Sequence, residues 1–373
     1  MRILVDENVP LAQELFGSHG DVVFFNGRSL SKIDLNDAKA LICRSVTKAN
    51  ESLLSGSAIE FVGSCTIGTD HLDIDYLNNR HIRWVNAPGC NAQSVAEYVI
   101  SCLALINKFH ADFKVGIVGC GNVGSRVYEE MEGIGMSCSA YDPFRQEDPS
   151  LSDDKQYTSL EDAMNSDIVC VHTPFTTGGT YPTELMIGYA ELALLKENAV
   201  LLSAGRGGVV DERAMVEVSV KRPDINWVMD VWANEPDINV KTHELAAIGT
   251  PHIAGYSLEG KQNGTKQVYD AFCKHFGVTA NNDLKQSDER IQVPGKISSL
   301  KQLILTVYNP KHDGERMTAA RLDDSDNDAS LSWFDALRKN YPIRHERTAY
   351  VFKNALLNEA EHRIALALGF QFG

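Results

Sequence analysis

The stretch KVGIVGCGNVGSRVYEE, residues 114–130, decides the fold, because it joins an apolar run to a helical run through three glycines. Residues 114–119 have the length and β-branched character of a buried strand, and 122–134 have helical spacing. A second strand follows at 137–142 and ends in an acidic residue, Asp142. This order of strand, glycine turn, helix and acidic strand end is typical of a doubly wound parallel sheet that binds a dinucleotide.

The glycine turn has the pattern G-x-G-x-x-G at Gly119, Gly121 and Gly124. The first glycine allows the tight turn, the second lets the backbone approach a pyrophosphate, and the third lets the helix pack on the strand. The N–H groups of Asn122 and Val123 begin the helix, where the helix dipole favours a negative charge. We therefore expect the pyrophosphate of a dinucleotide to bind here.

The acid that ends the second strand selects the cofactor. Asp142 lies eighteen residues after Gly124, where a carboxylate accepts both hydroxyls of a ribose and repels a 2′-phosphate. This predicts NAD as the cofactor. Arg145 follows three residues later and keeps NADP open as an alternative.

Alternating strands and helices extend outward from this motif in both directions. Strand candidates precede it at 2–6, 21–25, 40–45, 59–64 and 82–87, and follow it at 137–142, 167–173, 199–204, 225–230 and 248–254. Long helices are predicted at 91–109 and 258–277. Strands that alternate with helices indicate parallel sheets, so we expect an α/β protein with two doubly wound, Rossmann-like domains.

The sequence changes character after residue 280. Residues 280–295 are polar and rich in turn formers, and then come a strand candidate at 303–309 and helix candidates at 330–342 and 354–368. This predicts a small C-terminal α+β domain. The family resemblance described below implies how these parts are organised: a discontinuous substrate-binding domain at 1–90 with 255–280, an NAD-binding domain at 91–254 and a C-terminal dimerisation domain at 281–373.

Composition limits the partners of the chain. Its 373 residues carry a formal net charge of −15, which argues against nucleic acid or an anionic membrane surface as a partner. Eight cysteines form no C-x-x-C pair, so we expect no metal site. The beginning of the sequence has no signal-peptide pattern, and no apolar run is long enough to span a membrane. A reduced, cytoplasmic protein is expected.

Three charged residues follow successive strands of the predicted NAD-binding domain: Arg206, Glu235 and His252. A lone histidine in an apolar run is more often structural. Ligands of open parallel sheets bind at the carboxyl ends of the strands, however, and all three residues should lie there.

A carboxylate beside an imidazole orients the ring and stabilises its charged form. The imidazole can then accept the proton of an alcohol as a hydride leaves, and an arginine can bind a neighbouring carboxylate. We expect His252 to be the acid–base group, Glu235 to orient it and Arg206 to bind the substrate carboxylate.

Several ordered motifs together resemble one family. The glycine motif, LLSAGRGGVVDERAM (201–215), MDVWANEP (229–236) and TPHIAG (250–255) are similar to the D-isomer-specific 2-hydroxyacid dehydrogenases, and the likeness covers nearly residues 1–280. It implies an NAD-dependent oxidoreductase in which Arg206, Glu235 and His252 are the catalytic set.

Within that family, the chain most resembles a branch that oxidises 4-phospho-D-erythronate in vitamin B6 biosynthesis. The stretches that carry the likeness are ICRSVTKAN (42–50), HTPFTTGGTYPTELMI (172–187) and PHIAGYSLEGKQNGT (251–265). The resemblance implies a homodimer formed through the C-terminal domain. It implies substrate contacts from Ser45, Thr66 and Tyr256, and cofactor contacts from Asn122, Val123, Asp142, Thr173, Ala204, Gly205, Arg206, Asp230 and Gly255.

Two alternatives stay open at this point. The first is a dehydrogenase of the same family that acts on phosphoglycerate or glycerate, and the second is a non-catalytic protein that senses NADH. Arg44 is a candidate for a second anion site, with a surface ion pair as the equal alternative. Arg344 and Arg347 are candidates to reach a second subunit, an interpretation that the sequence favours less.

Overall fold

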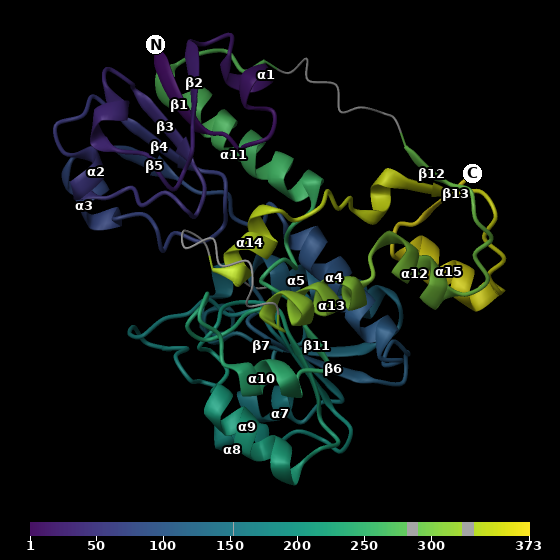
Figure 1. Ribbon diagram of the computed structural model, residues 1–373. Coiled ribbons are helices and arrows are strands. Elements are labelled where there is room, and N and C mark those ends of the chain that lie inside the picture. The colour runs from purple at the N-terminus through teal and green to yellow at the C-terminus, as the bar shows by residue number, and fades with distance from the viewer. Residues whose placement is uncertain (152, 282–289, 323–331) are drawn as a thin grey trace. The chain divides into compact units, whose positions relative to one another are not determined.

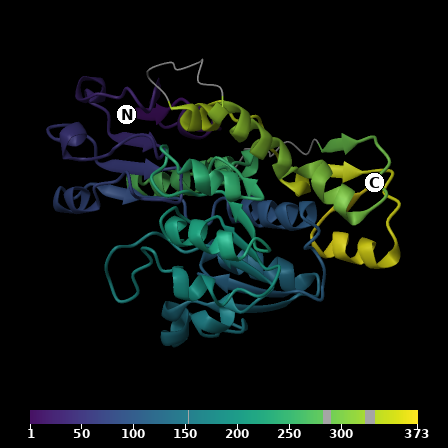
Figure 2. The same cartoon turned by 60° about the horizontal axis from the view of Figure 1, so that its bottom comes forward.

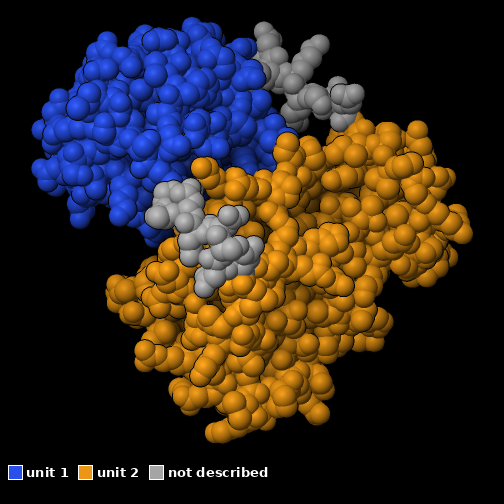
Figure 3. All heavy atoms as spheres, in the orientation of Figure 1, with its two compact units in different colours: residues 1–91, 256–289 blue, residues 92–255, 290–373 orange. Residues whose placement is uncertain are grey.

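A computed structural model describes residues 1–151, 153–281, 290–322 and 332–373. The chain divides into two compact units, one of residues 1–91 with 256–289 and one of residues 92–255 with 290–373 (Figure 3). The chain returns to the first unit at residue 256. The predicted boundaries of the substrate-binding and NAD-binding domains stay predictions. The assignment of 281–373 to a third, separate domain stays a prediction.

The first unit is built on a parallel sheet with the strand order β2-β1-β3-β4-β5 among the described residues. Its strands are β1 (Arg2–Asp6), β2 (Asp21–Phe25), β3 (Ala40–Cys43), β4 (Phe61–Ser64) and β5 (Arg83–Val85). Its helices are α1 (Ala12–Phe16), α2 (Glu51–Leu54), α3 (Ile74–Asn79) and α11 (Leu258–Phe276).

Side chains alternate between the two faces of this sheet, as the period of a strand requires. Ile3 and Val5 pack with Val268 and Phe272 of α11, whereas Leu4 packs in the cluster on the opposite face. Residues far apart in the sequence therefore share one core, which explains why the first unit is discontinuous.

The second unit holds a larger parallel sheet, with the order β11-β10-β9-β8-β6-β7 among the described residues. Its strands are β6 (Lys114–Val118), β7 (Ser137–Tyr141), β8 (Ile168–Val171), β9 (Val200–Ser203), β10 (Asn226–Met229) and β11 (Ile248–Gly249). The strand order reverses between β6 and β8, and ligands of such sheets bind at this switch point.

Helices of varied length precede and connect the strands of the larger sheet. They are α4 (Ala92–Leu105), α5 (Asn122–Gly133), α6 (Pro143–Glu147), α7 (Leu160–Met164), α8 (Tyr189–Leu192), α9 (Glu212–Lys221) and α10 (Val240–Leu245) (Figure 1). No helix of the described residues is long and apolar enough to cross a membrane.

The C-terminal residues pack with this second unit. They form α12 (Leu300–Val307), α13 (Pro310–Leu322), α14 (Trp333–Lys339) and α15 (Glu359–Ala367), with strands β12 (Ile291–Val293), β13 (Tyr350–Phe352) and β14 (Gln371–Phe372) in a small parallel sheet. Both α12 and α13 contact α4 (Figures 1 and 2). Met317 and Phe334 are fully buried in the same apolar cluster as Trp227 and Trp232.

The predicted fold class is confirmed, with two corrections to its elements. The strand predicted at 303–309 is wrong, because Leu300–Val307 is the helix α12. Ser299 caps its N-terminus, and Leu300, Leu303 and Ile304 are buried at helical spacing, so the apolar run was read with the wrong period.

The strand predicted at 248–254 is the second correction, because β11 ends at Gly249. Pro251 brings no N–H group to a sheet, and His252 has a left-handed backbone with φ of 55°. Residues 250–254 therefore form a loop at the end of the strand.

Candidate active site

The glycine loop after β6 fits the roles that its sequence predicts. Gly119 has φ of 86°, and a Cβ atom on it would lie 2.7 Å from Thr173 Cγ2. A Cβ atom on Gly124 would lie 2.0 Å from the carbonyl oxygen of Gly119, so the helix packs here on the turn itself. At Gly121 a Cβ atom would meet no described atom within 4 Å. The open side of the loop lies at the glycine that should face the pyrophosphate.

The same loop leads into the N-terminus of α5. Asn122 is exposed and Val123 half-buried in its first turn, where N–H groups have no partner within the helix. Asp142 follows the last residue of β7, and its Oδ2 accepts a hydrogen bond of 2.9 Å from the backbone N–H of Cys120. Its Oδ1 caps α6 by accepting a bond of 3.3 Å from the N–H of Arg145. Through its bond to Cys120, Asp142 ties the glycine loop to the end of β7. The sequence did not predict this structural role.

The loops after β8 and β9 border the glycine loop. A Cβ atom on Gly205 would lie 2.7 Å from the carbonyl oxygen of Thr173, so these two backbones are in direct contact. Thr173 Oγ1 is buried and has no hydrogen-bond partner among the described residues. Ala204 and Gly205 are half-buried beside it. An unsatisfied buried hydroxyl is costly unless a ligand uses it, so this region fits a bound NAD.

The loops that carry Arg206 and Glu235 are also in contact. A Cβ atom on Gly207 would lie 1.8 Å from the carbonyl oxygen of Trp232, so only a glycine fits at that position. Arg206 is half-buried and its Nη1 donates to the carbonyl of Gly205 at 3.0 Å. The contacts thus run from the glycine loop through Thr173 and Gly205 to the end of β10.

The two side chains that the sequence predicts as an acid–base pair lie in contact. His252 Nδ1 lies 2.8 Å from Glu235 Oε2, and the other carboxylate oxygen accepts a 2.9 Å bond from the N–H of Trp232. The His252 side chain keeps 28% of its surface exposed and Glu235 keeps 19%. The ring therefore turns Nδ1 to the carboxylate and leaves Nε2, on its opposite side, for a ligand.

The carboxylate of Glu235 is held in its charged form. Burial acts to raise its pKa, but the charge and hydrogen bond of His252 and the N–H of Trp232 outweigh burial and lower it below its ordinary value. Arg338 of α14 adds to this lowering. A charged Glu235 can orient the imidazole and stabilise it when it takes a proton.

Asp230 holds the loop that carries His252. Its buried carboxylate accepts bonds from Thr250 Oγ1 at 2.7 Å, from the N–H of Ile253 at 2.8 Å and from the N–H of Ala254 at 2.9 Å. The resemblance implied a cofactor contact for Asp230, and that contact stays a prediction. The structural task of this carboxylate was missed by the sequence analysis.

The expected substrate-binding residues belong to the first unit. Ser45 is exposed just after β3, and Tyr256 is half-buried with the Lys261 ammonium 5.0 Å from the centre of its ring. Thr66 Oγ1 lies 2.9 Å from Ser64 Oγ, which lies 2.9 Å from Nε2 of His71. Burial lowers the pKa of His71 to about 4, so this histidine is neutral near pH 7.

Comparison with known proteins places this site in a class of enzymes. Residues 103–254 match the model of the D-isomer specific 2-hydroxyacid dehydrogenase, NAD binding domain. An NAD⁺-bound 3-phosphoglycerate dehydrogenase of Entamoeba histolytica is similar in structure, with a TM-score of 0.63, 25% identity, and coverage of 77% of this chain and 99% of that one. D-Lactate dehydrogenase of Aquifex aeolicus, solved with NAD and lactic acid, gives a TM-score of 0.59 at 25% identity, covering 74% of this chain and 96% of that one. The chain is an NAD-dependent dehydrogenase of the D-isomer-specific 2-hydroxyacid class.

Full-length relatives narrow the class to one family. Erythronate-4-phosphate dehydrogenase of Cellvibrio japonicus is 41% identical over 380 residues, which cover 100% of both chains. The protein of the same name from Azotobacter vinelandii is 42% identical, with 93% of each chain covered. The chain belongs to the erythronate-4-phosphate dehydrogenase family.

Proposed function

We propose that this protein oxidises 4-phospho-D-erythronate at C2, with NAD as the oxidant, to (R)-3-hydroxy-2-oxo-4-phosphobutanoate in vitamin B6 biosynthesis. The observation that carries the acid–base chemistry is the 2.8 Å contact between His252 Nδ1 and Glu235 Oε2. The substrate follows from the relatives named for erythronate 4-phosphate, which match the whole chain, whereas the phosphoglycerate enzyme matches 77% of it.

His252 takes the proton in this reaction. NAD supplies the acceptor for the hydride that leaves C2. As the C2–H bond breaks, Nε2 of His252 accepts the proton of the C2 hydroxyl, and the C2–O bond becomes a carbonyl. Glu235 stabilises the imidazolium that results, and Arg206 binds the substrate carboxylate and polarises the carbonyl in the reverse direction.

The remaining ligand contacts follow the resemblance. Cofactor contacts are proposed for Gly119, Gly121, Asn122, Val123, Gly124, Asp142, Thr173, Ala204, Gly205, Arg206, Asp230 and Gly255. Substrate contacts from the first unit are proposed for Ser45, Thr66 and Tyr256. Two observations support the cofactor part of this assignment: the Thr173 hydroxyl has no hydrogen-bond partner in the described part of the chain, and Gly121 has an open side.

The assembly and location of the enzyme are also proposals. We infer a homodimer formed through residues 281–373 and a cytoplasmic enzyme. The homodimer is tested by light scattering of the intact protein, which should give twice the mass of one chain.

A substrate panel tests the proposed function. Purified protein with NAD is given 4-phospho-D-erythronate, 3-phosphoglycerate, D-glycerate or D-lactate, and NADH is followed by its fluorescence. The proposal expects the highest kcat/KM for 4-phospho-D-erythronate. Equal or better turnover of 3-phosphoglycerate would replace the assignment with the phosphoglycerate alternative, and NADH binding without turnover of any substrate would favour a sensor.

A further inference from the structure

The loop that carries His252 is strained. His252 has φ of 55°, in the left-handed region that residues other than glycine rarely occupy. Such a conformation is costly and persists only where the surroundings enforce it. The groups that hold residues 250–254 therefore also set the direction of the imidazole.

One side of this loop is fixed by the end of β10. The N–H of His252 donates to the carbonyl of Asp230 at 2.7 Å, and the Asp230 carboxylate accepts from the N–H groups of Ile253 and Ala254. Tyr98 of α4 reinforces this arrangement, because its hydroxyl lies 2.8 Å from Thr250 Oγ1. The N–H groups of the loop are thus held by an anion.

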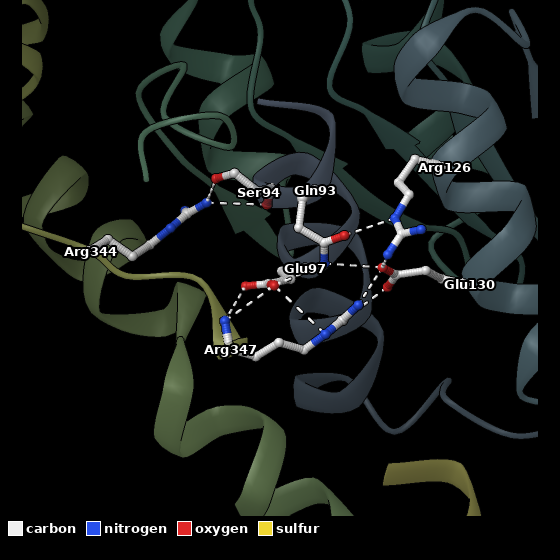
Figure 4. Close-up of polar contacts among 7 residues, drawn as sticks. All are labelled: Gln93, Ser94, Glu97, Arg126, Glu130, Arg344 and Arg347. Atoms are coloured by element: carbon white, nitrogen blue, oxygen red, sulfur yellow. Dashed lines mark hydrogen bonds and ion pairs between the residues drawn. The ribbon is translucent and has the colours of Figure 1, made fainter. Parts of the chain in front are cut away.

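The other side is fixed by the C-terminal part of the chain. Arg344 Nη1 donates to the carbonyl of Ile253 at 3.4 Å, and its Nη2 donates to the carbonyl of Ala254. The same Nη2 donates to the hydroxyl of Ser94 and, at 3.1 Å, to its carbonyl (Figure 4). Arg344 and Arg347, the two candidates to reach a second subunit, are both buried against their own chain.

The peptide group between Ile253 and Ala254 lies between two opposite charges. Its carbonyl accepts from the Arg344 guanidinium, and its N–H donates 2.9 Å to the Asp230 carboxylate. A peptide dipole aligned between a cation and an anion is held in one orientation. This peptide group lies one residue after His252 in the same loop.

The Arg344 guanidinium is itself held in place. The guanidinium lies 4.3 Å from the ring centre of Tyr308, the residue that caps the C-terminus of α12. Tyr341 lies three residues before Arg344 in the sequence. Arg347 anchors the same segment to α4 and α5, because its backbone N–H donates to Glu97 and its side chain is paired with Glu130 (Figure 4). Burial of a charged group is costly unless it is well paired, so a guanidinium at this position needs a reason.

We propose that Arg344 is a positioning residue for catalysis, which clamps the 250–254 loop against Asp230 and so aims Nε2 of His252 at the substrate hydroxyl. The C-terminal part of the chain then completes the active site of its own subunit. This inference rests on the proposed role of His252 as the acid–base group.

The test compares Arg344→Gln, which removes the charge and the fork of donors, with Arg344→Lys, which keeps the charge. Arg363→Gln, on the exposed surface of α15, is the matched control. For each variant, kcat and KM are measured with 4-phospho-D-erythronate, the Kd of NADH by fluorescence, and amide hydrogen exchange over residues 250–254. A misplaced catalytic group costs on the order of 10²-fold in rate.

We expect Arg344→Gln to lower kcat by about 10²-fold, with the Kd of NADH within twofold of wild type, and to speed exchange at Ile253 and Ala254. Arg344→Lys should keep part of the wild-type kcat, and the control Arg363→Gln should keep all of it. If Arg344→Gln does not fold, Arg344→Lys must still show slower turnover and faster exchange.

Wild-type kcat and unchanged exchange in the folded Arg344 variants would overturn the inference. Failure of the proposed function is distinguishable, because wild-type protein would then turn over none of the substrate, while the exchange data would still report on the loop.

Discussion

At the scale of single residues, the account depends on the pair of His252 and Glu235. Both were predicted from the sequence, because acidic, basic and imidazole side chains after successive parallel strands must meet at one edge of a sheet. The loop that carries His252 was not predictable. A left-handed φ at a histidine and the bonds from Asp230 depend on tertiary contacts that no local pattern encodes.

Replacing Glu235 with glutamine tests the charge of this pair. Glu235→Gln keeps an oxygen that accepts a hydrogen bond but loses the charge that stabilises an imidazolium, so we expect kcat to fall by about 10²-fold. The wild-type pKa of Glu235 lies below its ordinary value, so the stability that its charge contributes is present above that ordinary value and is lost as the pH falls through the lowered pKa. Thermal unfolding should show wild type more stable than Glu235→Gln at pH 7, with the difference shrinking in acid. An equal difference at both pH values would contradict this.

Alanine substitutions at two glycines of the loop after β6 should have opposite effects on stability and on NADH binding. A Cβ atom on Gly124 would meet backbone at 2.0 Å, so Gly124→Ala should cost about 1–3 kcal/mol of stability. Gly121 has φ of −72° and open space, so Gly121→Ala should leave the unfolding free energy nearly unchanged. It should instead weaken NADH binding by about tenfold, because the methyl group fills the space that the pyrophosphate needs. Urea unfolding and NADH titration of both variants check this, and loss of stability in Gly121→Ala would show that the loop was misread.

At the scale of elements, the sequence predicted most strands of both sheets within a few residues, because buried parallel strands are short apolar runs between turn signals. The exception is β11, which ends at Gly249 and not at residue 254. The same reasoning failed at Leu300–Val307, where an apolar run of similar length forms a helix. In so short an apolar run, length and composition do not distinguish the period of a helix from that of a strand. Capping by Ser299 and burial against α4 decide the outcome.

The contact between the C-terminal part and α4 should depend on pH through Glu97. Burial, aided by nearby Glu346 and Glu130, raises the pKa of Glu97 to about 7, although Arg347 opposes the shift. Between its ordinary value of 4.5 and 7, the folded state therefore binds more protons than the unfolded state, and the Glu97 contribution to stability falls as the pH rises. Glu97→Gln removes this loss, so its unfolding free energy should gain on wild type between pH 5 and pH 8. A constant difference across this range in urea unfolding would refute the assignment.

At the scale of the whole molecule, the length of the chain predicted several domains, and the family resemblance implied a discontinuous first domain. The way the C-terminal residues pack was not predictable. Met317, Phe334 and Arg344 come from a part of the sequence that has few strong periodic signals, yet they are buried against residues of the second unit.

The packing of the C-terminal residues predicts the effect of truncation. A chain that ends at residue 281 loses Met317 and Phe334 from the apolar cluster around Trp227 and Trp232, and loses Arg344 from the His252 loop. We therefore expect the fragment to be less stable than the intact chain and to aggregate, rather than to form a stable monomer. Circular dichroism and light scattering of the fragment provide the check. A monomer with the Tm of the intact protein would mean that the C-terminal part serves assembly alone.

The most direct test of the central claim is hydride transfer by His252→Ala. Wild type and variant are mixed with NAD and 4-phospho-D-erythronate, NADH formation is followed in a single turnover, and NADH affinity is measured separately by fluorescence. We predict that the variant binds NADH with the wild-type Kd but forms it about 10³-fold more slowly, because the hydroxyl proton has no acceptor. Turnover within tenfold of wild type, or loss of NADH binding with the chemical step unchanged, would contradict the account.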